Sequence, residues 1–419
     1  MRALVFDATP WRVVPAGAAA RVHPLGALRW HPHLRLRDWP EPALPGPDWL
    51  RLRPRHAGIC GSDLTQARLA ASVDNPLSGL LSFPHVMGHE IVAQVEAAGA
   101  AAGEWAAGSW VVVDPWLGCL ARGRQPLCAA CAAGHPPLCA HAGRPGPAAG
   151  MGPGLHLGNV RGLPGGFGEV LVAHRSQCHR LPAGLDPAAA VLADPVAVAC
   201  HAVERAGADL GPAAPIVVLG AGTVGLAVTA VWRQRAPERP VLVTAAWPHL
   251  AAAVRDLGAT PIAPAPAAVV AAVGALTGAR PVRPWRGHPW LIGGGAAVVV
   301  DTIGAATTME TALAVVRPRG RVVVVGVSRP ARTETTLTYY KEVEVVGANG
   351  AGRLQTWPGQ PWAFDAALDL LRTARPPLAR WCTHAFPLER WADAFRAAAR
   401  PQRSGAIKVV LTIPGEGRR

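Results

Sequence analysis

The glycine-rich stretch VVLGAGTVGLA, residues 217–227, constrains the fold of this chain more than any other feature. It follows an apolar run and opens an alanine-rich stretch, and five further apolar runs come after it. Buried β-branched runs that alternate with helical segments indicate a parallel α/β sheet. The sequence therefore predicts a doubly wound sheet of six strands, placed at residues 215–220, 240–245, 260–264, 296–304, 321–327 and 342–348.

The G-x-G-x-x-G spacing of this stretch is typical of a turn that binds a dinucleotide. Glycines permit the tight turn and the close approach of a pyrophosphate, and the following helix N-terminus offers N–H groups to the phosphates. We expect NAD or NADP to be held there, by Gly220, Ala221, Gly222, Thr223, Val224 and Gly225.

The end of the second strand departs from the usual dinucleotide pattern. Ala245 stands where an Asp or Glu commonly binds the ribose hydroxyls, and no arginine follows directly to hold a 2′-phosphate. The sequence therefore leaves the choice between NAD and NADP open.

The first 190 or so residues have a different organisation. Strand-like pieces at 49–58, 90–99, 109–115 and 166–174 are joined by long loops rich in glycine and proline. This pattern favours a mostly β domain with irregular excursions. The tail beyond about residue 345 combines one helical stretch, 389–400, with a closing strand at 406–413, and residues 286–295 form an inserted loop.

The positive charge of the chain permits two interpretations. The formal net charge is +14, and only Lys341 and Lys408 are lysines, so arginine carries nearly all of it. A basic zinc protein that binds nucleic acid is one interpretation; scattered arginines favour the other, a compositional bias of the whole chain. No apolar run approaches the ~20 residues of a membrane span, and the N-terminus lacks a signal peptide. We expect a cytoplasmic protein with no membrane or nucleic-acid partner.

Four of the eight cysteines crowd into residues 119–139. Cys119, Cys128, Cys131 and Cys139 have the spacing C-x8-C-x2-C-x7-C. Four thiolates so close in sequence can close a tetrahedral shell around zinc, and a closed shell is structural. Four unrelated thiols, or two disulfides, are the alternatives.

A second set of ligand types is spread along the chain. Cys60 lies in GICGSD, His89 and Glu90 in GHE, and Asp194 in ADPV. Cysteine, histidine and carboxylate together can form an open zinc shell with one position left for water or substrate. Taken singly, each has an ordinary interpretation: a histidine beside a glutamate is usually hydrogen-bonded, and an Asp before Pro is usually a turn or helix cap.

The motifs GICGSD, GHE, the four-cysteine lobe, GGFGE, ADPVAVACHAV and GAGTVG follow one another in this order. The series resembles the zinc-containing medium-chain alcohol dehydrogenases, and the ADPVAVACHAV segment looks most like the sorbitol and threonine dehydrogenase branch. The resemblance implies a GroES-like catalytic domain (1–195, zinc lobe 115–142), a Rossmann domain (196–342) and a C-terminal return to the catalytic domain (343–419). It also implies a homodimer or homotetramer, and two zinc ions per chain, one catalytic and one structural.

The resemblance also implies a role for each residue of the open shell. Cys60 and His89 correspond to catalytic zinc ligands, and Glu90 to the adjacent carboxylate that ligates or alternates at the metal. Asp194 stands where the family places a third ligand or a carboxylate bonded to the zinc-bound water. Ser62 corresponds to the hydroxyl that relays the substrate proton.

Three departures from the family pattern accompany these roles. Asp194 is one methylene shorter than the usual glutamate, the x8 spacing displaces the first lobe cysteine, and Thr65 replaces a histidine of the proton relay. We expect Asp63 to orient the metal ligands. The predicted function is hydride transfer between a secondary alcohol, polyol or amino alcohol and a nicotinamide cofactor. A catalytically impaired member of the family is the alternative within this fold.

Overall fold

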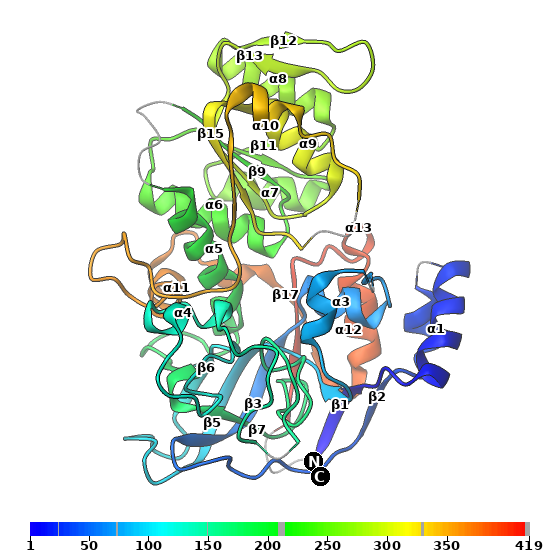
Figure 1. Cartoon of the computed structure of the whole chain (residues 1–419), viewed down its shortest axis with the longest axis vertical. Helices are drawn as coiled ribbons and strands as arrows, with labels where there is room; N and C mark the ends of the chain where they lie inside the picture. Colours follow the sequence, from blue (N-terminus) through cyan, green and yellow to red (C-terminus); the bar gives the residue numbers. More distant parts are fainter. Residues whose placement is uncertain (24, 73, 149, 208–213, 328–330, 415–419) are drawn as a thin grey trace. The chain divides into compact units, whose positions relative to one another are not determined.

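A computed structural model describes residues 1–23, 25–72, 74–148, 150–207, 214–327 and 331–414. The chain forms two compact units (Figure 1): Met1–Asp194, Ala351–Arg353 and Phe364–Arg419 make up the first, and Pro195–Gly350 and Leu354–Ala363 the second. The predicted boundary at 342 would separate strand β16 (Glu344–Gly347) from the second unit. The structure instead keeps β16 there, because it pairs with β15 (Val316–Val324) and completes the parallel sheet.

The second unit contains the predicted six-stranded sheet. The strand order is β11-β10-β9-β14-β15-β16, and every pairing is parallel. This is the doubly wound order in which ligands bind at the carboxyl ends of the strands, where the order reverses. The remaining bounds are β9 (Ile216–Leu219), β10 (Val241–Thr244), β11 (Thr260–Ile262) and β14 (Ala296–Asp301).

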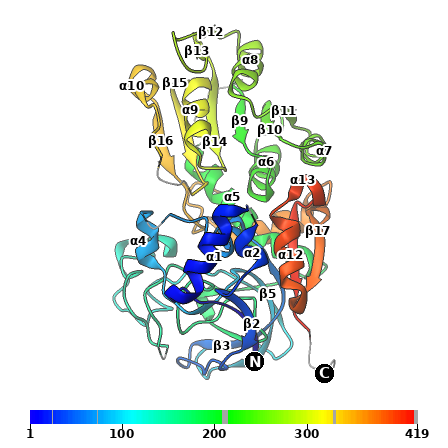
Figure 2. The ribbon, with the colours of Figure 1, turned by 90° about the vertical axis from the view of Figure 1, so that its right-hand side faces the viewer.

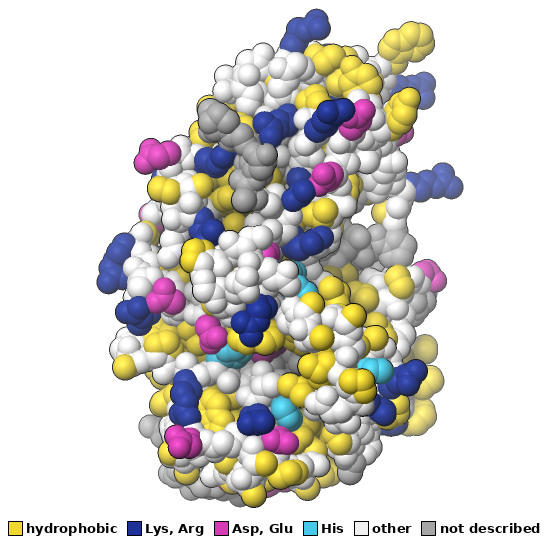
Figure 3. Space-filling model, turned by 60° about the vertical axis from the view of Figure 1, so that its left-hand side comes forward, with side chains coloured by type: hydrophobic (Ala, Val, Ile, Leu, Met, Phe, Trp, Pro, Cys, Tyr) yellow, Lys and Arg dark blue, Asp and Glu magenta, His cyan; other side chains and the backbone are white. Residues whose placement is uncertain are grey.

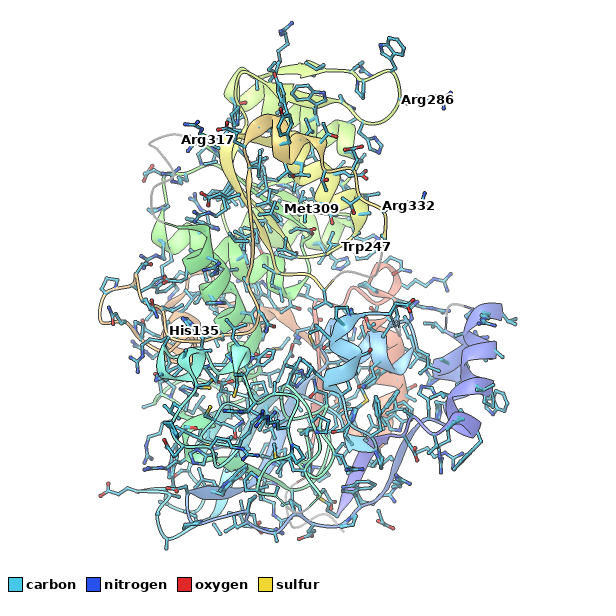
Figure 4. All side chains as sticks on the ribbon, viewed as in Figure 1. His135, Trp247, Arg286, Met309, Arg317 and Arg332 are labelled. Atoms are coloured by element: carbon cyan, nitrogen blue, oxygen red, sulfur yellow. The ribbon has the colours of Figure 1, made fainter. Side chains whose placement is uncertain are left out.

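Helices connect these strands (Figure 2): α5 (Ala193–Ala206), α6 (Thr223–Arg235), α7 (Pro248–Asp256), α8 (Pro266–Thr277), α9 (Ala306–Val315) and α10 (Thr336–Lys341). The inserted loop is an antiparallel ribbon of β12 (Arg280–Val282) and β13 (Trp290–Ile292). Arg286 projects from the connection between the two strands (Figure 4).

Lys341 closes the C-terminal end of α9. Its ammonium donates to the carbonyls of Leu313, Ala314 and Val316 at 2.9, 2.9 and 2.8 Å, although the side chain is buried. Burial lowers the pKa of Lys341 to about 8. Carbonyls at a helix end need donors of this kind, because no later turn supplies them.

The first unit is built mainly from two sheets, as expected for a mostly β domain. A seven-stranded sheet has the order β17-β18-β3-β5-β6-β8, with β7 paired to β3, and a smaller sheet has the order β2-β1-β4. The bounds are β1 (Arg2–Phe6), β2 (Leu34–Asp38), β3 (Trp49–Gly58), β4 (His85–Val86), β5 (Glu90–Ala98), β6 (Trp110–Val113), β7 (Leu171–His174), β8 (Cys178–Arg180), β17 (Cys382–Pro387) and β18 (Lys408–Thr412).

Two helices interrupt the chain between β1 and β2, where the sequence predicted strands and loops. They are α1 (Pro10–Val22) and α2 (Gly26–Arg29), and they lie next to each other (Figure 2). A Cβ at Gly26 would meet the carbonyl of Ala19 at 1.8 Å, so only glycine allows this approach. The unit also contains α3 (Gly61–Ala67), α4 (Ala129–Ala132), α11 (Ala363–Thr373), α12 (Trp391–Ala398) and α13 (Pro401–Ser404).

Within the described part of the chain, no helix has both the length and the apolar character that crossing a membrane requires.

Candidate metal centres and dinucleotide turn

Cys60 occupies the junction between a strand and a helix. It follows the end of β3 and is the N-cap residue of α3, with extended backbone. Asp63, in the first turn of α3, accepts a hydrogen bond from the Cys60 N–H through Oδ2 at 2.9 Å. This capping bond fixes the backbone of the cysteine, whose thiol lies beside the His89 ring.

His89 and Glu90 come from the turn that leads into β5. Gly88 has φ +91°, and a Cβ there would lie 2.5 Å from the ring of Phe167, so the turn requires glycine. Glu90 lies opposite Gly58 of β3, where a Cβ would lie 1.9 Å from Glu90 Oε2. The glycine of β3 thus makes the space that the buried carboxylate fills.

The structure brings three predicted ligands together. One ligand atom each from Cys60, His89 and Glu90 lie within 4.8 Å of one another. Sulfur, imidazole nitrogen and carboxylate oxygen are the donors of open zinc sites, so the residues fit this metal. Asp194, in the first turn of α5, lies outside this set of mutually close atoms.

The surroundings of this centre are rich in buried acidic groups. Asp63, Glu90 and Asp194 are all buried, and Asp63 Oδ1 lies 3.7 Å from His89 Nδ1. Burial alone would lower the pKa of His89, but Asp63 and Cys60 raise it well above its ordinary value. Burial raises the pKa of Asp194 to about 7, although His89 opposes this. So much buried negative charge favours a cation at the centre.

Lys408, on β18, is a member of this centre that the sequence analysis did not identify. Its ammonium lies 2.7 and 2.6 Å from the two oxygens of Glu90 and also donates to the carbonyl of Ile59. Burial alone would lower the pKa of Lys408, but the charge of Glu90 raises it above its ordinary value. Lys408 thus occupies both oxygens of the Glu90 carboxylate, and Glu90 can turn to a metal only by weakening this pair. The sequence contained one hint of a special role for Lys408. Lysine occurs only twice in this arginine-rich chain, and the structure buries both residues.

We expect Lys408→Met to destabilise the first unit by about 3–5 kcal/mol, because it leaves the Glu90 carboxylate buried without its partner. Side chains of Lys408 and Glu90 are only 3% and 2% exposed, so solvent screens the pair little. Urea unfolding of Lys408→Met, Glu90→Gln and the double variant measures the coupling. The double variant should recover part of the loss; additive losses would contradict the pairing.

The aromatic rings of His156 and Trp116 pack beside His89. The ring of His156 lies 4.8 Å from the ring of His89, and Trp116 meets His156 edge-on at 5.2 Å. Asn159 donates to His156 Nε2 at 2.9 Å, so Nδ1 carries the proton and donates to the Leu157 carbonyl at 2.6 Å. Burial lowers the pKa of His156 to about 3, with His89 adding to the effect. His156 is therefore a neutral support for His89 that no sequence motif indicated.

The two hydroxyls next to Cys60 differ in availability. Ser62 is exposed at the start of α3. Thr65 Oγ1 donates to the Gly61 carbonyl at 2.9 Å, one helical turn back. The Thr65 hydroxyl is therefore used within its own helix. Ser62 is the hydroxyl near Cys60 that can accept a proton.

The four lobe cysteines form a second compact group. Ligand atoms of Cys119, Cys128, Cys131 and Cys139 lie within 4.8 Å of one another, and all eight cysteines are free thiols. The 3.7 Å between the sulfurs of Cys119 and Cys139 matches the edge of a ZnS₄ tetrahedron with bonds of about 2.3 Å. The N–H groups of Cys119, Cys128 and His141 donate to lobe sulfurs. Burial opposes ionisation of Cys128, but hydrogen bonds from Ala140 and Cys131 lower its pKa to about 6.

Arg122 supports the lobe from inside. The side chain is buried and donates to the carbonyls of Leu117 and Arg144 at 2.9 and 2.8 Å and to that of Gly154. Burial lowers the pKa of Arg122, whereas Cys139 and Cys119 act in the opposite direction. If the four cysteines bound zinc as thiolates, the guanidinium of Arg122 would offset part of the negative charge that remains. Nothing in the sequence separates Arg122 from the other arginines.

The glycine turn of the second unit has the shape of a pyrophosphate cradle. Gly220 has φ +106°, and a Cβ at Gly225 would lie 1.8 Å from the Gly220 carbonyl. Gly222 is the N-cap of α6, and a Cβ there would meet no atom within 4 Å. The first and third glycines thus serve the turn and its packing, and the second leaves open space in front of a helix N-terminus. This arrangement fits a dinucleotide phosphate.

Threonines and an aspartate hold the loops around this turn. Thr244 Oγ1 accepts from the Gly220 N–H at 2.7 Å, and Thr302 Oγ1 donates to the Leu219 carbonyl at 2.8 Å. The buried Asp301 accepts from the N–H groups of Ile303 and Gly304, both at 3.0 Å. Ala245 follows β10, and the next side chains toward α7 are Ala246 and Trp247 (Figure 4). This stretch supplies neither a carboxylate nor a cation for an adenosine ribose.

Comparisons with known proteins agree with this geometry. Residues 46–183 match the alcohol dehydrogenase GroES-like domain, and residues 223–368 match the zinc-binding dehydrogenase domain. The sorbitol dehydrogenase of Arabidopsis thaliana is 27% identical over 88% of this chain and 89% of its own length.

Solved structures give the same answer. The alcohol dehydrogenase TADH from Thermus sp. ATN1 is 27% identical with a TM-score of 0.70, covering 99% of this chain and 100% of its own. A zinc-binding dehydrogenase from Sinorhizobium meliloti 1021, solved with NADP, is 25% identical with a TM-score of 0.67, covering 90% and 95%. With its GroES-like and Rossmann parts both matched, the chain belongs to the zinc-containing medium-chain dehydrogenase family, in its sorbitol dehydrogenase-like branch.

Proposed function

We propose that this protein is a zinc-dependent dehydrogenase that transfers hydride between a secondary alcohol or polyol and NAD or NADP. The observation that carries the proposal is the convergence of Cys60, His89 and Glu90 in a chain that also has a dinucleotide turn. Relatives named for sorbitol and L-idonate support the polyol class. Amino alcohols stay within the proposal, because no residue of the described site excludes them.

Each residue of the centre has a role in this proposal. Cys60 and His89 would hold the zinc, with Glu90 or Asp194 completing the shell. When bound, zinc supplies a Lewis acid that lowers the proton affinity of an alcohol oxygen, and the nicotinamide supplies the hydride acceptor. Asp63 orients the cysteine through its backbone, and Ser62 Oγ would receive the substrate proton and pass it to water.

We further propose two zinc ions per chain, the second in the four-cysteine lobe. The lobe has no open position, so its ion would be structural. A cytoplasmic location is part of the proposal, since eight free thiols fit a reducing compartment. A homodimer or homotetramer formed by edge-strand pairing of the nucleotide-binding units stays a prediction. On the face drawn in Figure 3, Lys and Arg side chains are scattered among hydrophobic and acidic ones, which gives little support to a nucleic-acid surface.

A substrate panel tests the proposal directly. Secondary alcohols, polyols and amino alcohols are offered with NAD and, separately, with NADP, while absorbance at 340 nm and zinc per chain are measured. We expect reduction of at least one cofactor by a polyol or secondary alcohol, and two zinc ions per chain. Bound zinc and bound cofactor without turnover on any substrate would instead indicate a catalytically impaired member of the family.

A further inference from the structure

Helix α1 presents its apolar side chains outward. Trp11, Val14 and Val22 are 73%, 68% and 88% exposed, and Ala18 is exposed as well. Residues spaced by three and four lie on one side of a helix, so Trp11, Val14, Ala18 and Val22 form one stripe along α1. We call these four residues the α1 stripe. An amphipathic helix on a globular protein normally turns such a stripe toward the core.

The opposite side of α1 is the side attached to the protein. Ala16 is buried, and the carbonyl of Ala19 packs against Gly26 of α2. Arg12 pairs with Asp7 at 3.1 Å and donates to the Pro32 carbonyl. These contacts fix the orientation of the helix, so the exposure of the α1 stripe is part of the fold. Figure 1 shows α1 at the periphery of the first unit.

The charge around the α1 stripe is mainly positive. Between Ala8 and Arg37 the chain carries five arginines and no Asp or Glu. The side chains of Arg21 and Arg29 are exposed and, among the described residues, make no hydrogen bond or ion pair. A second tryptophan, Trp30, is 60% exposed directly after α2. The surface therefore combines apolar side chains, indole rings and unpaired cations.

The combination of exposed apolar side chains and unpaired arginines favours one kind of binding partner over the others. A second copy that docked through the same surface would bring Arg21 and Arg29 of both copies together without a carboxylate to pair with them. Phosphates of nucleic acid would neutralise the arginines but would offer nothing to exposed valines. An anionic lipid surface satisfies both requirements, because its headgroups meet the arginines while tryptophan and valine enter the boundary below them. We propose that the α1 stripe, with Arg21 and Arg29, docks the protein onto an anionic phospholipid surface.

The length of α1 decides how it would lie. Its 13 residues extend about 20 Å, whereas the hydrocarbon core of a bilayer is about 30 Å thick. The helix is therefore too short to span and would lie in the plane of the interface, which differs from the expectation of no membrane partner. The apolar side chains and the arginines would both contribute to binding the lipid surface. We expect this binding to be reversible and to weaken with salt, because salt screens the arginines.

Cosedimentation with vesicles tests this proposal on the full chain. The wild type should bind phosphatidylcholine vesicles that contain about a third phosphatidylglycerol, and should bind pure phosphatidylcholine at least about tenfold more weakly. The double variant Trp11→Glu with Val14→Glu should lose about tenfold or more in binding. A matched control, Trp285→Glu with Leu276→Glu, makes the same charge change at exposed residues of the second unit and should bind as the wild type does.

A second pair of variants isolates the charge. Arg21→Gln with Arg29→Gln should weaken binding to the anionic vesicles, whereas Arg283→Gln with Arg286→Gln should not. Absence of wild-type binding to anionic vesicles at low salt, or equal losses in both pairs, would overturn the proposal. So would a dimer in lipid-free sedimentation velocity that Trp11→Glu with Val14→Glu dissociates, because the α1 stripe would then be covered by a second copy. Dehydrogenase activity without vesicles should be the same in all these α1 variants, which separates this test from that of the proposed function.

Discussion

Replacing Cys60 by serine, or His89 by alanine, is expected to reduce turnover by at least about 10³-fold while the dinucleotide still binds. Each change removes a donor from the group formed by Cys60, His89 and Glu90, and a metal shell that loses one of its few protein ligands no longer holds zinc in catalytic geometry. The glycine turn belongs to the second unit, so cofactor affinity should change little.

Three measurements check this expectation: kcat/KM on the best substrate of the panel, the Kd for the reduced cofactor by fluorescence, and zinc per chain. Cys178→Ser is the matched control, since this free cysteine lies on β8 and belongs to neither metal group. The control should keep both zinc ions and turnover. Unchanged turnover in Cys60→Ser or His89→Ala would rule out this metal centre.

Removing one cysteine from the lobe is expected to lower the stability of the protein more than its activity. Cys131→Ser opens a closed four-sulfur shell, and structural zinc sites contribute directly to folding. We expect the loss of one zinc per chain, a free energy of unfolding lower by at least about 4 kcal/mol, and a Tm lower by about 10 °C.

Zinc content and a thermal unfolding curve measure these effects. Cys200→Ser serves as the control, because Cys200 is a buried thiol of α5 that touches no metal group. Its replacement should retain both zinc ions and shift Tm by much less. A zinc content of two in Cys131→Ser, with an unchanged Tm, would show that the four sulfurs do not share an ion.

The parts of the fold that the sequence predicted are those encoded by local patterns. β-branched runs such as residues 296–301 and the glycines of the turn are local patterns, so the six parallel strands could be predicted from the alternation of strands and helices. The sequence placed residues 342–348 in this sheet, but the domain boundary at 342 that the resemblance implied separated that strand, β16, from it. The pairing of β16 with β15 decides to which unit the strand belongs, and a resemblance in motifs does not fix such a pairing to the residue.

The helix α1 illustrates why other parts were missed. Pro15 and Gly17 lie inside this helix, and both have low helix propensity in an interior position. Its outward apolar stripe also gives no contrast between a polar and an apolar side. Contacts with α2 hold the helix in place, and a single sequence does not reveal such contacts.

In the candidate site, too, residues within short motifs could be predicted, and residues brought in by the fold could not. Short motifs predicted Cys60, His89 and Glu90 as ligands, and the structure places their ligand atoms close together. Lys408 lies more than three hundred residues from Glu90 in the chain and was invisible to any local pattern. For Asp194 the motif alone indicated a role, and the structure places it beside the group without joining it.

The burial of both lysines has a consequence for the chemistry of the folded surface. Lys341 and Lys408 are enclosed, and the amino group of Met1 already donates to the Trp39 carbonyl at 3.1 Å. The native surface thus offers arginine guanidinium groups and almost no nucleophilic amine. Reagents that acylate amines will find at most the chain terminus until the protein unfolds, so their uptake becomes a direct measure of opening in either unit.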